Sequence, residues 1–256
     1  MKAAIIIPAR LQSTRLPNKM LLSETGMPLI CHTVERAVAI REASGGLFGE
    51  IIVAADAPEI VQVVGAHAVA KKLDVRAVMT DPGHQSGSDR IAEAARMLSG
   101  DIDAVLNLQG DEPDVPLDGV LALAEFYEDT GPDIATLVYP VRSEADRTNP
   151  ALVKAVLGSG GRALYFSRAD IPFRRDEKEE GPPSYGHVGI YLYRRTSLEK
   201  FVDLPQGVLE QTEKLEQLRA LENGMVITAL PLSSRPPKGI DTPEDYAEFV
   251  RGRLIN

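Results

Sequence analysis

Tryptophan is absent from this 256-residue chain, cysteine occurs once, and aromatic residues make up only 5 % of it. The single cysteine, Cys31, excludes an intramolecular disulfide and fits a reducing compartment. Because 44 % of the residues are hydrophobic, the chain can still bury a sizeable core, which we expect to be aliphatic. Its length suits a single α/β domain, residues 1–256, with room for a small sub-domain.

Long apolar runs are also missing, which predicts that no segment inserts into a membrane. The apolar residues 3–7 are too few for the central region of a signal peptide, and they run directly into Pro8 and Arg10. We interpret this segment as a buried strand, and we expect a cytoplasmic protein.

The chain lacks the basic surface that nucleic-acid binding usually requires, since 37 acidic residues outnumber 28 basic ones. Few aromatic residues are available to stack on bases, which further disfavours a nucleic-acid partner. A small anionic substrate would instead need a local basic cluster. One such cluster, Arg10, Arg15 and Lys19, lies within the first twenty residues.

Apolar, β-branched segments alternate with helical patterns through the first half of the chain. Near-continuous apolar strands separated by helices predict a mostly parallel sheet that is covered on both faces. In such sheets ligands bind beyond the carboxyl ends of the strands. The expected strands are 3–7, 50–54, 74–79 and 103–108, and the expected helices are about 28–42, 58–66 and 88–98.

The pattern changes after about residue 133, where strand-like segments have shorter connections. A charged stretch at 174–180, followed by Gly, Pro, Pro and Ser at 181–184, predicts a mobile surface loop. Thr242 as N-cap and Pro243 as the first helical residue predict a helix start. The expected strands are 134–141, 152–157, 162–166 and 187–194, and the expected helices are about 211–222 and 243–252.

The basic loop after the first strand, Pro8 to Lys19, is the first candidate site. Three cations within ten residues, at the carboxyl end of a strand, suit a triphosphate, because arginine offers a planar fork of donors and lysine a point charge. An ordinary solvated loop is the alternative. Neither a P-loop nor a glycine-rich dinucleotide motif follows the strand, so side chains would have to hold the phosphates.

The acidic loop after the fourth strand, Gln109 to Pro113, is the second candidate site. Asp111, beside Gly110, is a candidate Mg²⁺ ligand, although a turn with a local hydrogen bond gives the same pattern. Asp241 is the candidate second carboxylate. It precedes the helix at Thr242, where an acidic residue also simply favours the helix dipole.

Seven segments together resemble the 3-deoxy-manno-octulosonate (Kdo) cytidylyltransferases, also called CMP-Kdo synthetases. They follow the order found in that family and span nearly the whole chain. They are Ile7-Pro8-Ala9-Arg10 with Ser13-Thr14-Arg15-Leu16-Pro17 and Lys19, His84-Gln85-Ser86-Gly87-Ser88-Asp89-Arg90, Asn107-Leu108-Gln109-Gly110-Asp111-Glu112-Pro113, Ala163-Leu164-Tyr165-Phe166-Ser167-Arg168, His187-Val188-Gly189-Ile190-Tyr191, Glu213-Lys214-Leu215-Glu216-Gln217-Leu218-Arg219, and Asp241-Thr242-Pro243-Glu244-Asp245.

The resemblance implies a three-layer sandwich of the nucleotide-diphospho-sugar transferase kind, with a small β-rich region for sugar binding and dimerisation, and usually a homodimer. About 1–132 would bind CTP, about 133–230 would bind the sugar and dimerise, and about 231–256 would return with the second metal ligand. The implied site residues are Arg10, Arg15 and Lys19 for the phosphates, Ser13, Gln85, Ser86, Gly87 and Arg90 for the cytidine, Asp111 and Asp241 for Mg²⁺, and Gln109, Arg168, His187, Tyr191, Glu216 and Gln217 for the sugar.

The implied activity is transfer of CMP from CTP to the anomeric hydroxyl of Kdo, for lipopolysaccharide biosynthesis, with Asp111, Asp241, Lys19 and Arg10 as the catalytic residues. In-line attack on the α-phosphorus needs positioning and charge neutralisation by one or two metal ions, but no covalent intermediate. Cys31, within an apolar stretch, is therefore interpreted as a buried structural thiol.

Several alternatives remain open from the sequence. The stretch at 174–185 leaves the 8-amino analogue of Kdo as a second acceptor. Without the resemblance, Arg168 would be a surface residue, Tyr191 strand packing and His187 a hydrogen-bonded structural histidine. Transferases for sialic acid or methylerythritol phosphate, and a CTP-binding regulatory module without catalysis, are the other rivals.

Overall fold

The computed structural model describes residues 1–175 and 184–254. It divides into two compact units, Met1–Leu121 with Pro237–Asn256 (unit 1) and Ala122–Pro236 (unit 2). The first boundary falls inside helix α4 (Leu117–Thr130). The C-terminal segment thus belongs to the same unit as the first strands. The division into functional regions at about 132 and 230 stays a prediction.

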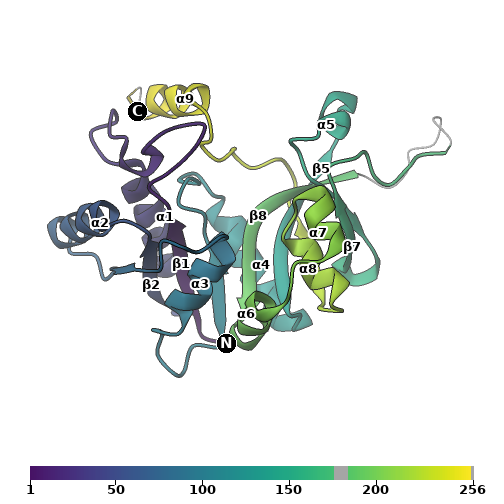
Figure 1. Ribbon diagram of the computed structural model, residues 1–256, viewed down its shortest axis with the longest axis horizontal. Helices are drawn as coiled ribbons and strands as arrows, with labels where there is room; N and C mark the ends of the chain where they lie inside the picture. Colours follow the sequence, from purple (N-terminus) through teal and green to yellow (C-terminus); the bar gives the residue numbers. More distant parts are fainter. Residues whose placement is uncertain (176–183, 255–256) are drawn as a thin grey trace. The chain divides into compact units, whose positions relative to one another are not determined.

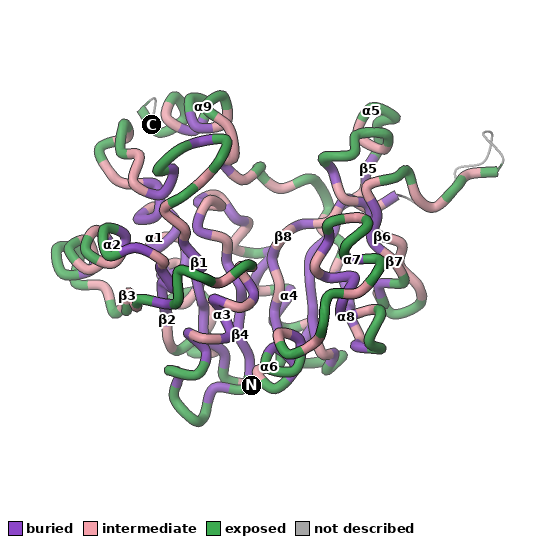
Figure 2. The backbone as a smooth tube through the Cα atoms, in the orientation of Figure 1, coloured by how far each residue is buried: buried purple, intermediate pink, exposed green. Residues whose placement is uncertain are grey.

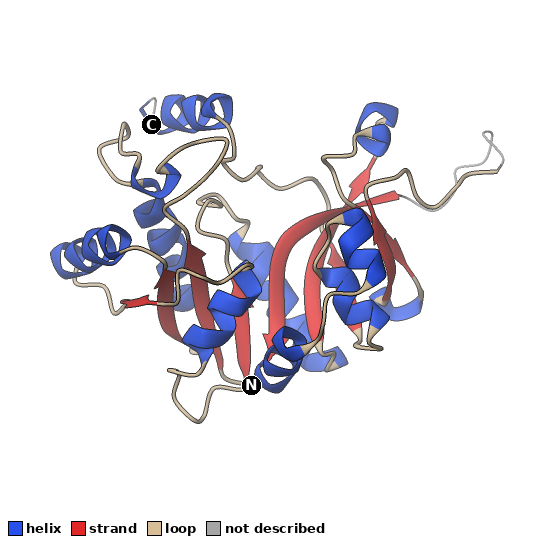
Figure 3. Cartoon of the chain, viewed as in Figure 1, coloured by secondary structure: helices blue, strands red, loops and turns tan. Residues whose placement is uncertain are grey.

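Unit 1 is built on a parallel sheet, whose strands are red in Figure 3. The strand order is β3-β2-β1-β4. The observed strands correspond to the four that were expected in the first half of the chain. They are β1 (Ala3–Ala9), β2 (Phe48–Ala55), β3 (Arg76–Met79) and β4 (Ala104–Asn107).

Helices cover the sheet of unit 1, as the apolar strands require. All seven residues of β1 are buried (Figure 2), so both faces of this central strand must be covered. α1 packs against α2 and against β2, and α3 packs against β1 and β2 (Figure 1). The helices of this unit, besides the start of α4, are α1 (Leu29–Ala43), α2 (Pro58–Lys71), α3 (Gly87–Ala95) and α9 (Pro243–Leu254), with a short 3-10 helix, η1 (Lys19–Leu21).

Strand β4 ends before its neighbour β1 does. Their pairing stops at Ile6 and Asn107, whereas β1 stays paired with β2 as far as Ala9. Proline has no N–H group to donate to a neighbouring strand, and Pro8 lies beyond the last pair with β4. The loops that follow β1 and β4 therefore leave the sheet side by side, and both carry candidate site residues.

Unit 2 is rich in β-structure. β5 (Ile134–Val141) lies between β8 (Ser184–Arg194), which is antiparallel to it, and β9 (Ile227–Pro231), which is parallel. β6 (Lys154–Leu157) pairs with β8 and with β7 (Ala163–Ser167). The helices are α5 (Glu144–Thr148), α6 (Arg195–Asp203), α7 (Val208–Glu213) and α8 (Gln217–Glu222), with a 3-10 turn, η2 (Ser159–Gly161).

The structure corrects one sequence prediction and adds elements that were not expected. The single helix predicted at about 211–222 is two helices, because Lys214 adopts the left-handed conformation (φ 55°) that ends α7. Helices α4, α5 and α6 and strand β9 were not predicted. The loop predicted at 174–184 falls largely on 176–183, outside the described residues. Within the described ranges, no helix has the length and apolar character needed to cross a bilayer.

Candidate active site

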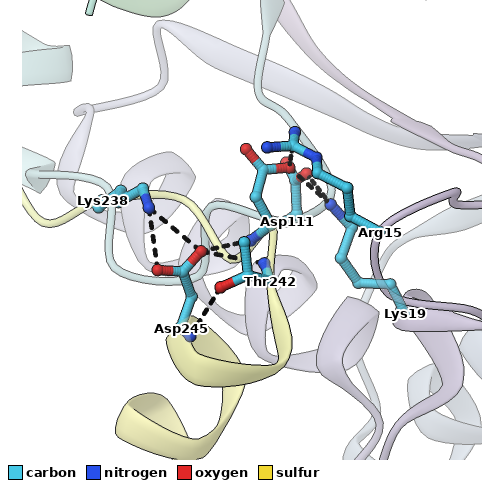
Figure 4. Close-up of polar contacts among 7 residues, drawn as sticks. Arg15, Lys19, Asp111, Lys238, Thr242 and Asp245 are labelled. Atoms are coloured by element: carbon cyan, nitrogen blue, oxygen red, sulfur yellow. Dashed lines mark hydrogen bonds and ion pairs between the residues drawn. The ribbon is translucent and has the colours of Figure 1, made fainter. Parts of the chain in front are cut away.

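Lys19 is the centre of a charge cluster in unit 1. Asn18 takes the left-handed conformation (φ 53°) and turns the chain into η1, so that Lys19 is only 5 % exposed. Its ammonium nitrogen contacts a carboxylate oxygen of Asp111 (Figure 4). The same nitrogen lies 3.3 Å from Oδ1 of Asp241. Arg15 approaches the same Asp241 oxygen at 3.0 Å. Three distant segments of the chain therefore meet at one place.

The acidic loop after β4 can reach this cluster only with glycine at position 110. A Cβ atom on Gly110 would lie 2.9 Å from the carbonyl oxygen of Pro8, closer than real Cβ contacts allow. Thr33 Oγ1 donates a hydrogen bond of 2.8 Å to the Gly110 carbonyl, and the Ile240 N–H donates one of 2.9 Å to the Asp111 carbonyl. These bonds join the loop to α1 on one side and to the segment before α9 on the other.

Asp241 is held by the start of helix α9, as the sequence predicted. The Asp245 N–H donates to Thr242 Oγ1 at 3.2 Å, and Asp245 Oδ2 accepts from the N–H groups of Thr242 and Asp241 at 3.0 and 3.1 Å. This reciprocal arrangement is a capping box. Lys238 adds an ion pair with Asp245 at 2.9 Å (Figure 4). The backbone of Asp241 is therefore fixed beside the carboxylate of Asp111.

Glu112 lies near the two carboxylates of this cluster. Burial, followed by the neighbouring carboxylates of Asp111 and Asp241, raises the pKa of Glu112 from 4.5 to about 8. Residues 1–175 and 184–254 contain no group of three or more His, Cys, Asp or Glu side chains arranged to hold a metal. The protein thus offers a pair of carboxylates, a donor set that fits Mg²⁺ when phosphate oxygens and water complete the coordination.

A pocket of about 430 Å³ lies beside the basic loop, at the carboxyl ends of β1 and β2. Arg90 is fully buried at its wall, donates to Thr80 Oγ1, and lies 3.9 Å from the Asp56 carboxylate. Burial lowers the pKa of Arg90. The Nε atom of Arg90 and the Nη2 atom of Arg10 are buried without a hydrogen-bond partner. The lining residues are Arg10, Leu11, Gln12, Thr14, Asp56, Ala57, Pro82, His84 and Arg90.

Unused N–H groups on the buried Arg90 and the half-buried Arg10 indicate that an acceptor-rich or anionic ligand belongs in this pocket. Buried polar groups are nearly always paired, and an isolated buried cation is costly. Of the predicted cytidine residues, Arg90 lines the pocket. Ser86 and Gly87 form the start of α3, where the Ser86 hydroxyl caps the helix through Asp89. Gln85 donates to the Gly83 carbonyl at 2.9 Å, and Ser13 is half-buried in the basic loop.

Sequence reasoning missed Asp56 and His84, which line this pocket, and Thr80, which contacts Arg90. Asp56 accepts a hydrogen bond of 2.8 Å from the Leu11 N–H and faces Arg90, so that it joins the basic loop to α3. Thr80 orients Arg90, and His84 pairs with Glu93 at 2.5 Å. Asp56 directly follows β2, and Thr80 directly follows β3. The rule that ligands bind at the carboxyl ends of parallel strands would have indicated both.

The predicted sugar residues are divided between the units. Gln109 lies in unit 1, after β4. Within unit 2, Arg168 follows β7 and contacts the corner between α7 and α8: its guanidinium donates to the carbonyls of Glu213, Pro150 and Lys214 at 2.8, 3.1 and 3.4 Å. The other predicted members are His187 and Tyr191 on β8, and Glu216 and Gln217 at the start of α8.

His187 has the environment of a neutral, hydrogen-bonded histidine. Its Nε2 lies 3.1 Å from Thr136 Oγ1, and its ring meets Phe166 edge-on and Tyr191 at centroid distances of 5.1 and 5.3 Å. Burial lowers its pKa from 6.5 to about 4. These contacts agree with the structural alternative for His187, and its predicted contact with a sugar stays a prediction. Cys31 is buried with its pKa raised to about 12, as expected of a structural thiol.

Comparison with known proteins places this geometry in a family. Residues 4–227 match the cytidylyltransferase family. The 3-deoxy-manno-octulosonate cytidylyltransferase of Paramagnetospirillum magneticum is 48 % identical over 248 residues, covering 94 % of this chain and 93 % of the relative. The enzymes of the same name from Brucella suis and Chloroherpeton thalassium are 46 % and 41 % identical, covering 96 % and 97 % of this chain and 93 % and 96 % of the relatives.

Solved structures agree with this relationship. A CMP:2-keto-3-deoxy-manno-octonic acid synthetase complexed with CTP is 37 % identical, with a TM-score of 0.89, and the match covers 100 % of this chain and 99 % of the other. A glucose-1-phosphate thymidylyltransferase from Bacillus anthracis, 17 % identical with a TM-score of 0.65 over 99 % and 96 % of the chains, shares the fold. The resemblance inferred from seven motifs is therefore confirmed, and the chain belongs to the cytidylyltransferase family, among relatives that are Kdo cytidylyltransferases.

Proposed function

We propose that this chain transfers CMP from CTP to the anomeric hydroxyl of Kdo, releasing pyrophosphate and supplying CMP-Kdo for lipopolysaccharide biosynthesis. The observation that carries the proposal is the contact of Lys19 with both Asp111 and Asp241, carboxylates that lie 130 positions apart in the printed sequence. Relatives that carry the Kdo cytidylyltransferase name over nearly their full length support the choice of acceptor.

The nucleotide would occupy the pocket of Arg10 and Arg90. The unused N–H groups of both side chains can donate to the oxygen atoms of CTP, and the pocket volume of about 430 Å³ is within the range of small-molecule sites. Arg15 and Lys19 would then neutralise charge on the triphosphate. For this, Lys19 would exchange part of its contact with the two aspartates for contact with phosphate.

Asp111 and Asp241 would hold Mg²⁺ together with phosphate oxygens and water. When bound there, the ion would neutralise charge that develops on the α-phosphate oxygens during the transfer. The protein's own task is to keep both carboxylates in place, which it does through the Ile240–Asp111 hydrogen bond and the capping box of α9. The reaction forms a bond from the sugar hydroxyl oxygen to the α-phosphorus, breaks the bond from the α-phosphorus to the pyrophosphate oxygen, and releases the hydroxyl proton to water.

Arg168 would bind the sugar carboxylate. Three of the five N–H groups of its guanidinium donate to main-chain carbonyls, which leaves two donors that no described residue accepts. Two donors on one planar group match the two oxygens of a carboxylate. We also propose a cytoplasmic homodimer, on the support of the single cysteine and of the resemblance.

The test is pyrophosphate release by the purified protein with CTP, Mg²⁺ and a panel of acceptors: Kdo, its 8-amino analogue, sialic acid and methylerythritol phosphate. We expect release with Kdo and loss of release when a chelator removes the metal. Preference for the 8-amino sugar would change the acceptor and keep the reaction type. Binding of CTP by calorimetry without release with any acceptor would replace the proposal with a regulatory CTP-binding module.

A further inference from the structure

Arg168 is held by its main chain as well as by its side chain, and the groups that hold it have no part in the proposed chemistry. Its N–H donates to a carboxylate oxygen of Glu213 at 3.0 Å, and its carbonyl accepts from the ammonium of Lys154 at 2.6 Å. One acid and one base thus fix the two sides of a single residue. We propose that Lys154 and Glu213 are positioning residues that hold Arg168 in the geometry needed to bind the acidic sugar.

Lys154 is an unusual residue to find at this position, because its side chain is fully buried in β6. Its three N–H donors are matched by three main-chain carbonyls, those of Asn149, Leu152 and Arg168, at 2.9, 2.6 and 2.6 Å. Burial lowers its pKa, since the charged form loses contact with water. A buried ammonium held only by carbonyls is costly, and an uncharged residue would pack in β6 without that cost.

Lys154 stabilises the conformation of the loop before β6 by donating to two of its carbonyls. Asn149 and Leu152 lie on either side of Pro150 in the sequence, and the Pro150 carbonyl accepts from Nη1 of Arg168 at 3.1 Å. Lys154 therefore fixes Arg168 twice, directly through the Arg168 carbonyl and indirectly through the loop that accepts from its guanidinium. Loss of this loop geometry would release the side chain as well as the main chain.

Glu213 acts from the other side, at the last residue of α7. One carboxylate oxygen accepts from Ser167 Oγ at 2.6 Å and the other from the Arg168 N–H, while its main-chain carbonyl accepts from Arg168 Nε at 2.8 Å. Lys214 ends the helix immediately afterwards, and its carbonyl accepts from Nη2. The corner between α7 and α8 thus faces the Nε side of the guanidinium, and the two remaining donors are left for a ligand.

This inference rests on the proposed function, in which Arg168 binds the sugar carboxylate. It adds that sugar affinity depends on residues that do not touch the sugar. A purely structural role would predict lower stability with unchanged KM values. A positioning role predicts a higher KM for the sugar with an unchanged KM for CTP, because small misplacements of an anchoring group cost binding and rate.

Unit 2 offers a matched control, Asp133. Like Glu213, it is half-buried and accepts from one serine hydroxyl and one main-chain N–H, those of Ser197 at 2.7 Å and Val226 at 2.9 Å. Asp133→Ala should therefore lower the melting temperature about as much as Glu213→Ala. It should leave the KM for the sugar unchanged, since Asp133 has no contact with Arg168.

The experiment compares Glu213→Ala, Glu213→Gln and Asp133→Ala with the wild-type protein, measuring melting temperature and the KM for Kdo and for CTP. We expect Glu213→Ala to raise the KM for Kdo by about 10-fold or more without changing that for CTP. Glu213→Gln should restore near-normal affinity, because its amide can still accept from the Arg168 N–H and donate to Ser167. If Glu213→Ala does not fold, Glu213→Asp, which is one methylene shorter, replaces it and should raise the same KM.

A double-mutant cycle separates positioning from a direct or a merely structural effect. In an Arg168→Ala background the further change Glu213→Ala should add little to the KM for Kdo, because the group that it positions is already gone. Three outcomes would overturn the inference. Glu213→Ala could raise the KM for Kdo and the KM for CTP equally, or Asp133→Ala could raise the KM for Kdo as much as Glu213→Ala does. The effects of Arg168→Ala and Glu213→Ala on the KM for Kdo could also be fully additive. Wild-type protein that releases no pyrophosphate with any acceptor would instead refute the proposed function.

Discussion

At the scale of single residues, Lys19 links the basic loop to both acidic segments. Lys19 is only 5 % exposed, and the carboxylates of Asp111 and Asp241 offset the cost of burying its charge. Each of the three residues had a plausible local explanation when considered alone. The sequence pattern could not exclude a solvated loop, a turn or a favourable helix start, but their shared contact favours one common site.

Asp111→Asn should reduce turnover by about 10²- to 10³-fold at saturating Mg²⁺, because it removes one of the two carboxylates that would hold the ion. Asp114→Asn is the control: Asp114 lies three positions later and pairs with Arg253 rather than with Lys19. Pyrophosphate release measures both variants, and circular dichroism checks their fold. Near-normal turnover of Asp111→Asn would rule out its role in holding the metal.

Arg168→Lys should raise the KM for Kdo by about 10- to 100-fold and leave the KM for CTP unchanged, because lysine cannot offer two donors in one plane. Arg162→Lys, an exposed position just before β7, should change neither constant. Steady-state kinetics with each substrate varied in turn would reveal the difference. An equal loss for both substrates would move Arg168 out of the sugar site.

At the scale of elements, helix α9 has a part in the site although only its first turn reaches it. Tyr246 and Phe249 pack with Leu16, Leu29 and Ile240 in one buried cluster, so the helix rests against the basic loop. The Tyr246 hydroxyl contacts the Glu24 carboxylate and accepts from the Glu24 N–H at 3.1 Å. The C-terminal helix therefore positions Asp241 through packing and through its capping box.

Thr242→Ala should lower the free energy of unfolding by about 1 kcal/mol, because the Asp245 N–H loses its acceptor at the start of α9. Thr242→Ser keeps the hydroxyl and should remain near the wild-type value. Chemical denaturation measures both. A loss of equal size in the serine variant would show that the methyl group, rather than the cap, is responsible.

At the scale of the whole molecule, His187 should make the stability of the chain depend on pH. Its pKa is about 4 in the folded protein, against 6.5 for an unperturbed histidine such as that of the unfolded chain. Between these pH values the unfolded chain therefore binds more protons than the folded protein does. The free energy of unfolding should therefore fall as the pH is lowered from 6.5 towards 4, by about 1–3 kcal/mol for this one group.

The measurement is denaturant unfolding at several pH values for the wild type and for His187→Asn. The variant should be less stable than the wild type at pH 7, because the substitution removes the hydrogen bond between His187 and Thr136. Its stability should change less steeply between pH 6.5 and 4. Parallel curves for the two proteins would show that His187 does not titrate in this range.

Local sequence patterns were sufficient to predict those elements whose structure depends on residues within the same segment. The apolar strands β1, β2 and β4 and the start of α9 were predictable because periodicity, proline and capping residues act within a few positions. The break between α7 and α8 was not, since Lys214 adopts a left-handed conformation that neither its residue type nor its neighbours indicate. Glu210 and Arg219, buried and paired at 2.6 Å, join the two helices across that break.

The amino-acid sequence by itself determined where the charged site residues stand along the chain: cations follow the first strand, an acid follows the fourth, and another acid precedes the last helix. Only the tertiary structure decided that these groups meet, that Gly110 must approach Pro8, and that Arg168 is held by Lys154 and Glu213. The physical reason is that contacts between distant segments depend on packing and burial, which no local pattern encodes.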